Sequence, residues 1–324
     1  MLDHITETFS TINRGFDSTF QAGRMSLGLV APIAAYPDCP VPDMAGHIAR
    51  VQQAEALGFR AIWLRDVPFN VASFGDAGQG YDPFTYLGFL AGQTTQIALG
   101  VASLVLPLRH PAHVAKAAAS VDVLSQGRLI LGVASGDRPD EYPAMNIDFD
   151  GRAAAMRDAV AYIRAMAHPS PRIHNRFGQI DGAIQGPMEM LPRPHAARLP
   201  LLITGSSRQS PDWIARNGDG WITYPRPALA QAQAINQWRM ELTAAQEPLK
   251  PVLQPLYVDL ADDPDEGPTP IHLGLRTGHR YLTSYLKDLE AAGVNHVALN
   301  LRFNRTPIDQ TLDRLARDVL PYFH

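Results

Sequence analysis

Residues 43–64 read DMAGHIARVQQAEALGFRAIWL and contain one complete transition from helix to strand. Small or apolar residues recur at helical spacing as far as Leu57, and Gly58 follows them as a C-terminal cap. The run Ala61–Leu64 is short and wholly apolar, as in the buried strands of parallel sheets. A similar transition occurs at Gly293, before the apolar run His296–Leu301. The repeated unit predicts an α/β protein.

The same alternation runs through the rest of the chain. Further strands are expected at Ser26–Ala31, Ile97–Val101, Leu129–Val133, Leu201–Thr204, Gly220–Thr223 and Val252–Leu260. Helices are expected at Asp43–Leu57, Pro83–Thr94, Ala112–Leu124, Arg152–Ala167, Pro211–Arg216, Ala228–Ala245, Arg280–Ala292 and Ile308–Val319. Eight strand–helix pairs in this order predict a (β/α)₈ TIM barrel. A doubly wound sheet is the main alternative, but it would need a glycine fingerprint after the first strand, and Gly28–Ile33 has none.

Two segments are too long to be simple connections. Val67–Asp82 follows the second strand, and His168–Leu199 follows the helix after the fourth. We expect both to be long insertions that cover the active site, because long loops on a barrel often build it. No clean linker divides the chain. We therefore expect one barrel domain at residues 25–324, preceded by a helical extension at residues 1–24.

The composition restricts partners and location. The chain of 324 residues carries 28 Lys+Arg against 32 Asp+Glu, so we expect neither nucleic acid nor a membrane as a partner. A single cysteine, Cys39, excludes an intramolecular disulfide framework and a cysteine-based zinc site. The first residues do not form a signal peptide, and we expect a cytoplasmic protein.

Position disfavours two reaction classes, because function on a barrel lies at the C-terminal ends of the strands. The three lysines, Lys116, Lys250 and Lys287, lie on predicted helices or before a strand, which argues against Schiff-base chemistry. His110 and His113 flank Pro111 at the start of a helix, so we expect no metal site.

The most specific local feature is Thr204–Trp213, which reads TGSSRQSPDW. A strand ends, a glycine turn follows, and a helix begins near Ser210. Three serine hydroxyls, Arg208 and several backbone N–H groups converge there, which favours a phosphate-binding site. The alternative is ordinary helix capping with an incidental arginine.

Five stretches together resemble the bacterial luciferase-like monooxygenase family. They are Ala54–Leu64, Leu106–Pro111 (LPLRHP), Ala115–Asp122, Leu124–Val133 (LSQGRLILGV) and Pro200–Tyr224, and they cover roughly residues 25 to 225 in good register. Asp122 and Arg128 belong to this pattern, but they lie near the bottom of the barrel, where we expect structural roles.

The resemblance implies a barrel that binds reduced FMN, supplied by a separate flavin reductase, and uses O₂ to oxygenate a small organic substrate. A branch of the superfamily uses a deazaflavin and transfers hydride instead. The family tends to form homodimers through early barrel helices.

The resemblance also implies the cofactor contacts. Ser207 and Ser210 would bind the phosphate, with Gly205, Ser206, Arg208 and Gln209 nearby. The turn Ser135–Gly136 would line the flavin, and a non-prolyl cis peptide is implied at Ala102–Ser103.

One position departs from the family pattern. The luciferases carry a functional histidine just after the second strand, where this chain has Val67. Asp66 could replace it, or the chemistry needs no such group, or the reaction is not monooxygenation. Asp137 and Arg138 are the other candidates for polar groups near the flavin, although they could instead form a structural ion pair.

We therefore expect a two-component FMNH₂-dependent monooxygenase. The alternatives are a deazaflavin-dependent dehydrogenase on the same barrel, a flavin-binding protein without turnover, and an unrelated barrel enzyme that acts on a phosphorylated sugar.

Overall fold

The computed structural model describes residues 8–39, 41–71, 80–181 and 188–324. Its barrel strands are β1 (Ser26–Val30), β2 (Ala61–Leu64), β3 (Ala98–Val105), β4 (Leu129–Ala134), β7 (Leu201–Thr204), β8 (Gly220–Ile222), β9 (Val252–Leu260) and β12 (His296–Asn300). Each pairs in parallel with its neighbour, and the sheet closes because β12 pairs with β1 and β8 with β9. The predicted (β/α)₈ barrel is confirmed, since a doubly wound sheet would be open.

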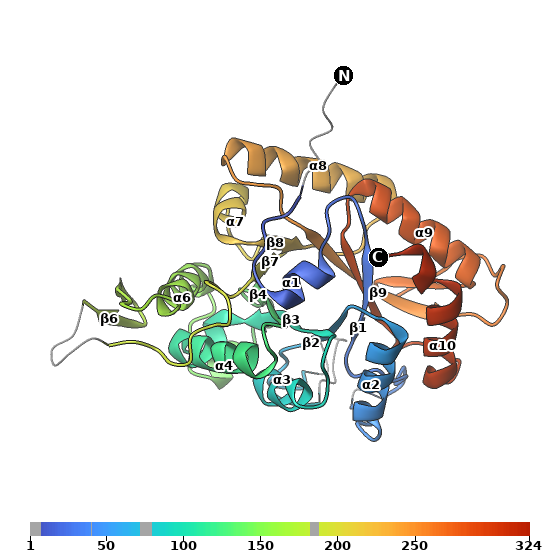
Figure 1. Cartoon of the computed structure of the whole chain (residues 1–324), viewed down its shortest axis with the longest axis horizontal. Helices are drawn as coiled ribbons and strands as arrows, with labels where there is room; N and C mark the ends of the chain where they lie inside the picture. The colour runs from blue at the N-terminus through green and yellow to red at the C-terminus, as the bar shows by residue number, and fades with distance from the viewer. Residues whose placement is uncertain (1–7, 40, 72–79, 182–187) are drawn as a thin grey trace.

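The helices surround the barrel (Figure 1). They are α2 (His47–Leu57), α3 (Pro83–Ala91), α4 (Pro111–Leu124), α6 (Arg152–Met166), α7 (Pro211–Asn217), α8 (Ala228–Ala244), α9 (His279–Ala292) and α10 (Ile308–Asp318). Gly58 and Gly293 end α2 and α9 with φ of 94° and 103°, and their N–H groups bond back to helical carbonyls. These are the left-handed caps that the sequence predicts.

The helix α1 (Arg14–Thr19) lies within the residues expected to form a helical extension. Several other short elements have no counterpart in the sequence prediction. They are α5 (Glu141–Ala144), the 3₁₀ turns η2 (Leu106–Leu108) and η3 (Leu320–Tyr322), and two hairpins, β5 (Ile173–Asn175)–β6 (Gly178–Ile180) and β10 (Thr269–Ile271)–β11 (Gly274–Thr277). Each is too short to display a clear hydrophobic period. The second hairpin extends the barrel sheet, because β11 pairs with the C-terminal half of β9.

The barrel interior is filled by side chains, and α1 covers its N-terminal end (Figure 1). Phe16 of α1 and Phe20, which caps the helix, pack in one cluster with Trp63 and other inward-facing strand residues. Trp63 fits because Gly100 has no side chain, and a Cβ there would lie 2.4 Å from the indole ring. The interior is therefore a packed core. Of the expected extension at residues 1–24, residues 1–7 lie outside the described chain.

Arg128 and Asp122 have the structural roles expected for them. Arg128 is buried and donates hydrogen bonds to the carbonyl oxygens of Thr94 and Ile97, both at 2.9 Å. Asp122 accepts from Asn13 Nδ2 at 3.0 Å, which ties the residue that caps α1 to α4. Among the described residues, no helix has both the length and the apolar character needed to cross a bilayer.

Candidate active site at the C-terminal end of the barrel

A cavity of about 380 Å³ opens at the C-terminal ends of the strands. Most residues predicted for the site line it, namely Asp66, Val67, Ala102, Ser103, Ser135, Gly136, Asp137, Arg138, Gly205, Ser206, Ser207 and Arg208. Gln209 and Ser210 do not. The structure therefore brings together strand-end residues that are far apart in sequence, whereas the role of each stays a prediction.

The turn after β7 has a backbone suited to an anion. Gly205, Ser207 and Arg208 have φ of 55°, 43° and 56°, in the left-handed region. Turns of this kind point successive N–H groups into one concavity. Ser207 Oγ donates to Thr204 O at 2.6 Å, which holds the turn closed. Within the described part of the chain, the N–H groups of Ser206 and Ser207 have no acceptor, so they are available to a ligand.

Gln209 and Ser210 lie outside the cavity lining and hold this turn to the neighbouring helices. The side chain of Ser210 caps α7 by accepting from Trp213 N at 3.3 Å. Gln209 Nε2 donates to Ala153 O at 2.9 Å, and its Oε1 accepts from Arg157 Nη1 at 2.9 Å. The first turn of α6 is thereby attached to the turn after β7.

The end of β3 has the irregular backbone that the resemblance implies. The peptide bond Ala102–Ser103 is cis, and the register between β3 and β4 shifts between Val101 and Leu104. The hydroxyl of Ser103 is hydrogen-bonded to that of Thr204. This contact links β3 directly to the start of the turn after β7.

The turn after β4 forms the next wall of the cavity. Gly136 has φ of 75°, and a Cβ there would lie 2.7 Å from the hydroxyl oxygen of Tyr142. Tyr142 is fully buried and donates its hydroxyl proton to Ser135 O. Burial raises the pKa of Tyr142 to about 12, so the phenol stays protonated near neutral pH and keeps this hydrogen bond.

Comparison with known proteins agrees with this geometry. A family model described as luciferase-like monooxygenase matches residues 23–295. The chain belongs to this family. Its luciferase-like barrel is also similar to the crystal structure of monooxygenase RslO1 from Streptomyces bottropensis, with a TM-score of 0.76 and 20% identity over 92% of this chain and 99% of that one.

The characterised relatives use different cofactors. The chain is 30% identical over 200 residues to the F420-dependent hydroxymycolic acid dehydrogenase of Mycobacterium tuberculosis. This match covers 60% of this chain and 51% of that protein. The chain is 27% identical over 172 residues to the oxygenase component of the flavin-dependent trigonelline monooxygenase of Acinetobacter baylyi. This match covers 52% of this chain and 44% of that protein. The chain thus spans about half the length of each relative. It is a luciferase-like oxidoreductase of the flavin- or F420-dependent kind.

Asp66, the first candidate to replace the luciferase histidine, is held in an ion pair. Its side chain is 1% exposed. Arg109 donates to both carboxylate oxygens, at 2.7 and 3.1 Å, and Val105 N donates at 3.1 Å. Arg109 also bonds to Asp82 at 2.9 Å, so it joins the two ends of the segment Val67–Asp82, of which residues 72–79 lie outside the described chain. This geometry gives Asp66 a positioning task, and its catalytic role stays a prediction.

Asp137 and Arg138 follow β4 and have different surroundings. Asp137 is exposed, whereas Arg138 is 7% exposed. Arg138 Nη1 lies 3.7 Å from the carboxylate of Glu141. Burial raises the pKa of Glu141 despite this arginine. Glu141 also lines the cavity, so the luciferase-like barrel offers a buried carboxyl beside the predicted pair.

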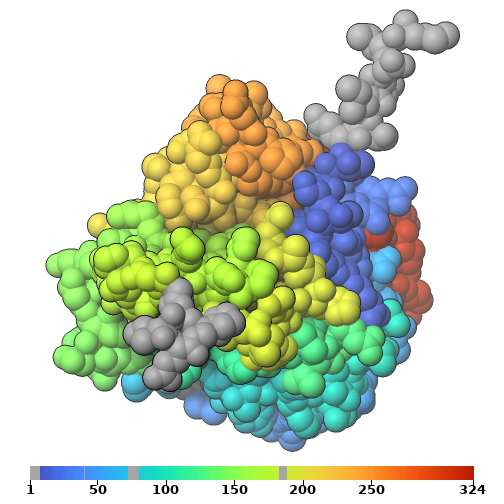
Figure 2. All heavy atoms as spheres, turned by 60° about the vertical axis from the view of Figure 1, so that its left-hand side comes forward, coloured from blue at the N-terminus to red at the C-terminus, as the bar shows by residue number. Residues whose placement is uncertain are grey.

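The expectation that His168–Leu199 covers the cavity is wrong for its described residues. None of them lines the cavity. The segment lies on the outer surface beside α4 and α6 (Figure 2), where Phe177 O is 3.0 Å from His110 Nε2 and Leu191 O accepts from Lys116. The reason is topological, because a barrel helix runs back along its strand. A segment between α6 and β7 therefore begins and ends at the N-terminal face.

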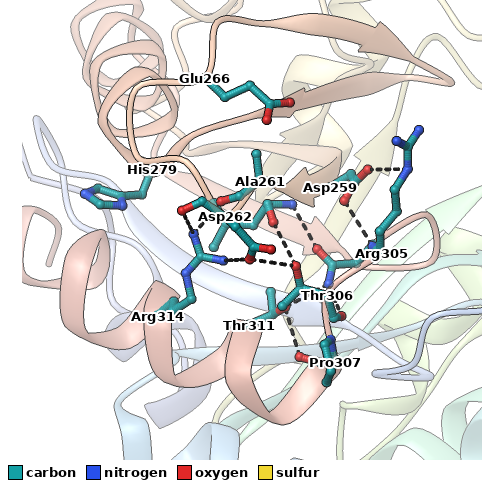
Figure 3. A network of polar contacts seen from close by, with 12 residues as sticks. Asp259, Ala261, Asp262, Glu266, His279, Arg305, Thr306, Pro307, Thr311 and Arg314 are labelled. Carbon is teal, nitrogen blue, oxygen red and sulfur yellow. Dashed lines mark hydrogen bonds and ion pairs between the residues drawn. The ribbon is translucent and has the colours of Figure 1, made fainter.

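Sequence reasoning missed several lining residues. They are Val30, Arg152, Thr223, Pro255, Tyr257, Leu273, Ala298 and Asn300. Leu273 lies at the tip of the β10–β11 hairpin. The base of this hairpin is held by the buried Asp259, which accepts from Arg276 Nη1 at 2.9 Å. Asp259 also accepts from Arg305 N at 3.0 Å (Figure 3). The length of the connection from β9 to α9 could have indicated it, since segments after strands reach the active face.

Proposed function

We propose that this protein is the oxygenase component of a two-component monooxygenase, which binds reduced FMN and uses O₂ to oxygenate a small organic substrate. The observation that carries the proposal is the pairing of two surfaces in one cavity. An anion-binding turn lies at Ser206–Arg208, and an apolar floor is formed by Val30, Val67, Ala102, Ile222 and Ala298. This pairing suits a cofactor with a phosphate at one end and a planar ring at the other.

The residues present fit reduced FMN. The N–H groups of Ser206 and Ser207 and the guanidinium of Arg208 would hold the phosphate, and Arg152 adds a buried positive charge to the same cavity. The cis-bonded bulge at Ala102–Ser103 and the turn Ser135–Gly136 would line the ring and its side chain. When bound, the reduced flavin supplies the electrons that activate O₂.

The chain itself positions the ring and excludes water. Val67 and its apolar neighbours keep the floor dry, which favours oxygen transfer over release of H₂O₂. Asp66 anchors Arg109, which fixes the segment that begins at Val67. A substrate would enter between this floor and the wall formed by Tyr257 and Leu273.

The proposal is tested by anaerobic titration with FMNH₂, followed by addition of O₂ with a panel of organic substrates. We expect binding at micromolar FMNH₂ and an oxygenated product whose yield matches the flavin consumed. Absence of FMNH₂ binding would refute the proposal. Binding that yields only H₂O₂ with every substrate would instead favour a flavin-binding protein without turnover. A phosphorylated sugar in the turn, detected by ³¹P spectroscopy or crystallography, would favour the unrelated barrel enzyme.

A deazaflavin-dependent dehydrogenase is the second candidate, and the F420-dependent relative in Mycobacterium tuberculosis favours it. Both cofactors carry a phosphate that the same turn could bind. Parallel spectral titrations with FMNH₂ and reduced F420 separate the two. Tighter binding of F420, with hydride transfer that does not need O₂, would replace the first candidate.

We also propose two protein partners. A separate reductase would supply the FMNH₂ transiently, and a second copy of the chain would form a homodimer through early barrel helices. Phe89 on α3 and Leu124 at the end of α4 are 49% and 66% exposed, which supports an apolar interface there. Light scattering would give the mass of one chain if the dimer proposal is wrong.

A further inference from the structure

Glu141, the first residue of α5, is a buried acid in the active cavity with an oxygen atom that the chain does not use. It lines the cavity and is 2% exposed. Its Oε1 has no hydrogen-bond partner among the described residues, and Arg138 Nη1, at 3.7 Å, is too distant to donate. A buried polar atom without a partner is costly, so this carboxyl group needs an explanation outside the chain.

The other two acids that line the cavity have different surroundings. Asp66 accepts from both Arg109 and the N–H of Val105, so both its oxygens are used. Asp137 is exposed, and water can satisfy its carboxylate. Of the acids that line the cavity in the described chain, Glu141 is therefore the one that is both buried and partly unsatisfied.

The carboxyl group of Glu141 lies beside the segment that begins at Val67. The backbone N–H of Phe69 is hydrogen-bonded to it closely enough to act on its pKa. Val67 is apolar and lines the same cavity, as do Ala102 and other residues of the floor. Glu141 therefore brings a group that can gain or lose a proton to the edge of an apolar surface.

The surroundings favour the protonated form of Glu141. Burial raises its pKa, and the charges of Asp66 and Asp137 act in the same direction. Arg138 and the N–H contact act to lower the pKa, but the net direction is upward. The neighbouring Tyr142 stays protonated and adds no charge near neutral pH. A protonated carboxyl group is a hydrogen-bond donor, which a carboxylate is not.

The charges around Glu141 also select the ligand that this donor would suit. An ammonium group would meet the guanidinium of Arg138, and a carboxylate would meet the charges of Asp66 and Asp137. Both kinds of charged ligand are therefore disfavoured at this point of the cavity. A neutral oxygen acceptor is not, and the carbonyl of an otherwise apolar molecule combines such an acceptor with a fit to the floor.

We propose that protonated Glu141 donates a hydrogen bond to the carbonyl oxygen of a neutral substrate, and that the protein therefore acts on ketones or aldehydes. The inference rests on the proposed function and names its substrate class. The hydrogen bond would orient the carbonyl group and withdraw electron density from its carbon atom, which makes that carbon more electrophilic.

The test measures ligand binding without turnover. Dissociation constants of cyclohexanone and larger cyclic ketones, each paired with the amine of the same skeleton, are determined anaerobically with FMNH₂-loaded protein over a range of pH. The variants are Glu141→Gln, Glu141→Leu and Asp140→Asn. Asp140 is the matched control, because this neighbouring acid is exposed, lies outside the cavity lining and makes no side-chain cap to α5.

The pH dependence distinguishes a donor from a structural group. Ketone binding to the wild type should weaken by about 3- to 10-fold as the pH rises through the titration of Glu141, because the carboxylate cannot donate. Glu141→Gln keeps a neutral donor and should bind ketones tightly at every pH. Glu141→Leu should bind them weakly at every pH, and Asp140→Asn should behave as the wild type does.

Infrared difference spectroscopy gives a second measurement, which needs neither turnover nor the leucine variant. The wild type and Asp140→Asn should show the carbonyl stretch of a protonated carboxyl group that shifts when the ketone binds. Glu141→Gln should lack this band. Absence of the band in the wild type would overturn the inference.

The remaining outcomes each contradict a defined part of the argument. Ketone binding that does not depend on pH in the wild type would overturn the role of Glu141, and so would equal weakening in Glu141→Gln and Glu141→Leu. Preference for the amines, or binding of neither class, would overturn the substrate class.

The same titrations without flavin separate the inference from the proposed function. If FMNH₂ does not bind, but ketone binding keeps the pH dependence that Glu141→Gln abolishes, the proposed function fails and the role of Glu141 stands. If FMNH₂ binds and this pH dependence is absent, the inference alone fails.

Discussion

Acid is expected to destabilise the protein through His296, an imidazole in the barrel interior. His296 is 0% exposed. Its Nε2 accepts from Trp63 Nε1–H at 2.9 Å, so the ring proton is on Nδ1, which lies 2.6 Å from Ser26 Oγ. Ser26 Oγ in turn donates to Thr19 O at 2.6 Å. Both ring nitrogens are used by the neutral form, and a second proton on Nε2 would face the indole N–H.

The size of the effect follows from the pKa. Burial lowers the pKa of His296 to about 3, whereas it is about 6.5 in an unfolded chain. Below pH 6.5 the unfolded state binds the proton and the native state does not, so the free energy of unfolding falls as the pH falls. At about 1.36 kcal/mol per pKa unit, the loss is about 2 kcal/mol at pH 5 and about 5 kcal/mol below pH 3.

The assay is urea unfolding of the wild type and His296→Gln at several pH values from 8 to 5. Glutamine is neutral throughout and can accept from Trp63 and donate to Ser26. Subtracting the two free energies of unfolding removes the contribution of all other titrating groups. We expect the advantage of the wild type to fall by about 2 kcal/mol over this range. A difference that stays constant to within about 0.5 kcal/mol would refute the reasoning.

Four further substitutions test the packing and the site. Gly100→Ala should lower the free energy of unfolding by about 3 kcal/mol, because its Cβ would lie 2.4 Å from the Trp63 ring. Gly88→Ala in α3 meets nothing within 4 Å and should raise it by about 0.5–1 kcal/mol, and similar melting temperatures would contradict both values. Asp66→Asn should cost about 3 kcal/mol, because Arg109 loses its buried counter-ion and keeps only the more exposed Asp82; thermal unfolding with FMNH₂ titration would show this. A stable variant with lost turnover would instead indicate catalysis by Asp66. Arg128→Met should lower the free energy of unfolding in urea by about 3 kcal/mol, because the carbonyls at the end of α3 lose their donor. The flavin affinity should not change, and an effect on flavin affinity alone would contradict this prediction.

The strands and helices were predictable because their signals are local. Gly58 and Gly293 mark helix ends through a backbone conformation that glycine adopts without cost, and the apolar runs that follow are long enough to show burial. The turn after β7 was predictable for the same reason, since Ser206, Ser207 and Arg208 are consecutive in sequence. The rule that function lies at strand ends then located the other predicted residues at the cavity, except Gln209 and Ser210.

The misplaced loop and the missed residues share a different origin. Length alone cannot tell which face of the barrel a segment reaches, and this is why His168–Leu199 was expected over a cavity that it does not line. Its place depends on whether a strand or a helix precedes it. Arg152 was missed because it begins a helix well after β4, and only the packing of α6 against Gln209 brings it to the turn after β7.

By itself, the sequence determined the barrel, the order of its elements and the serine-rich turn after β7, because propensity, capping and apolar runs act over a few neighbouring residues. Only the tertiary structure decided how the side chains at the strand ends are used. It placed Asp66 in an ion pair with Arg109, left Nε of Arg152 without a partner in the described chain, and enclosed neutral His296 beside Trp63. The burial of each side chain and its partners set its pairing and its protonation. Both depend on residues distant in sequence that closure of the sheet brings into contact.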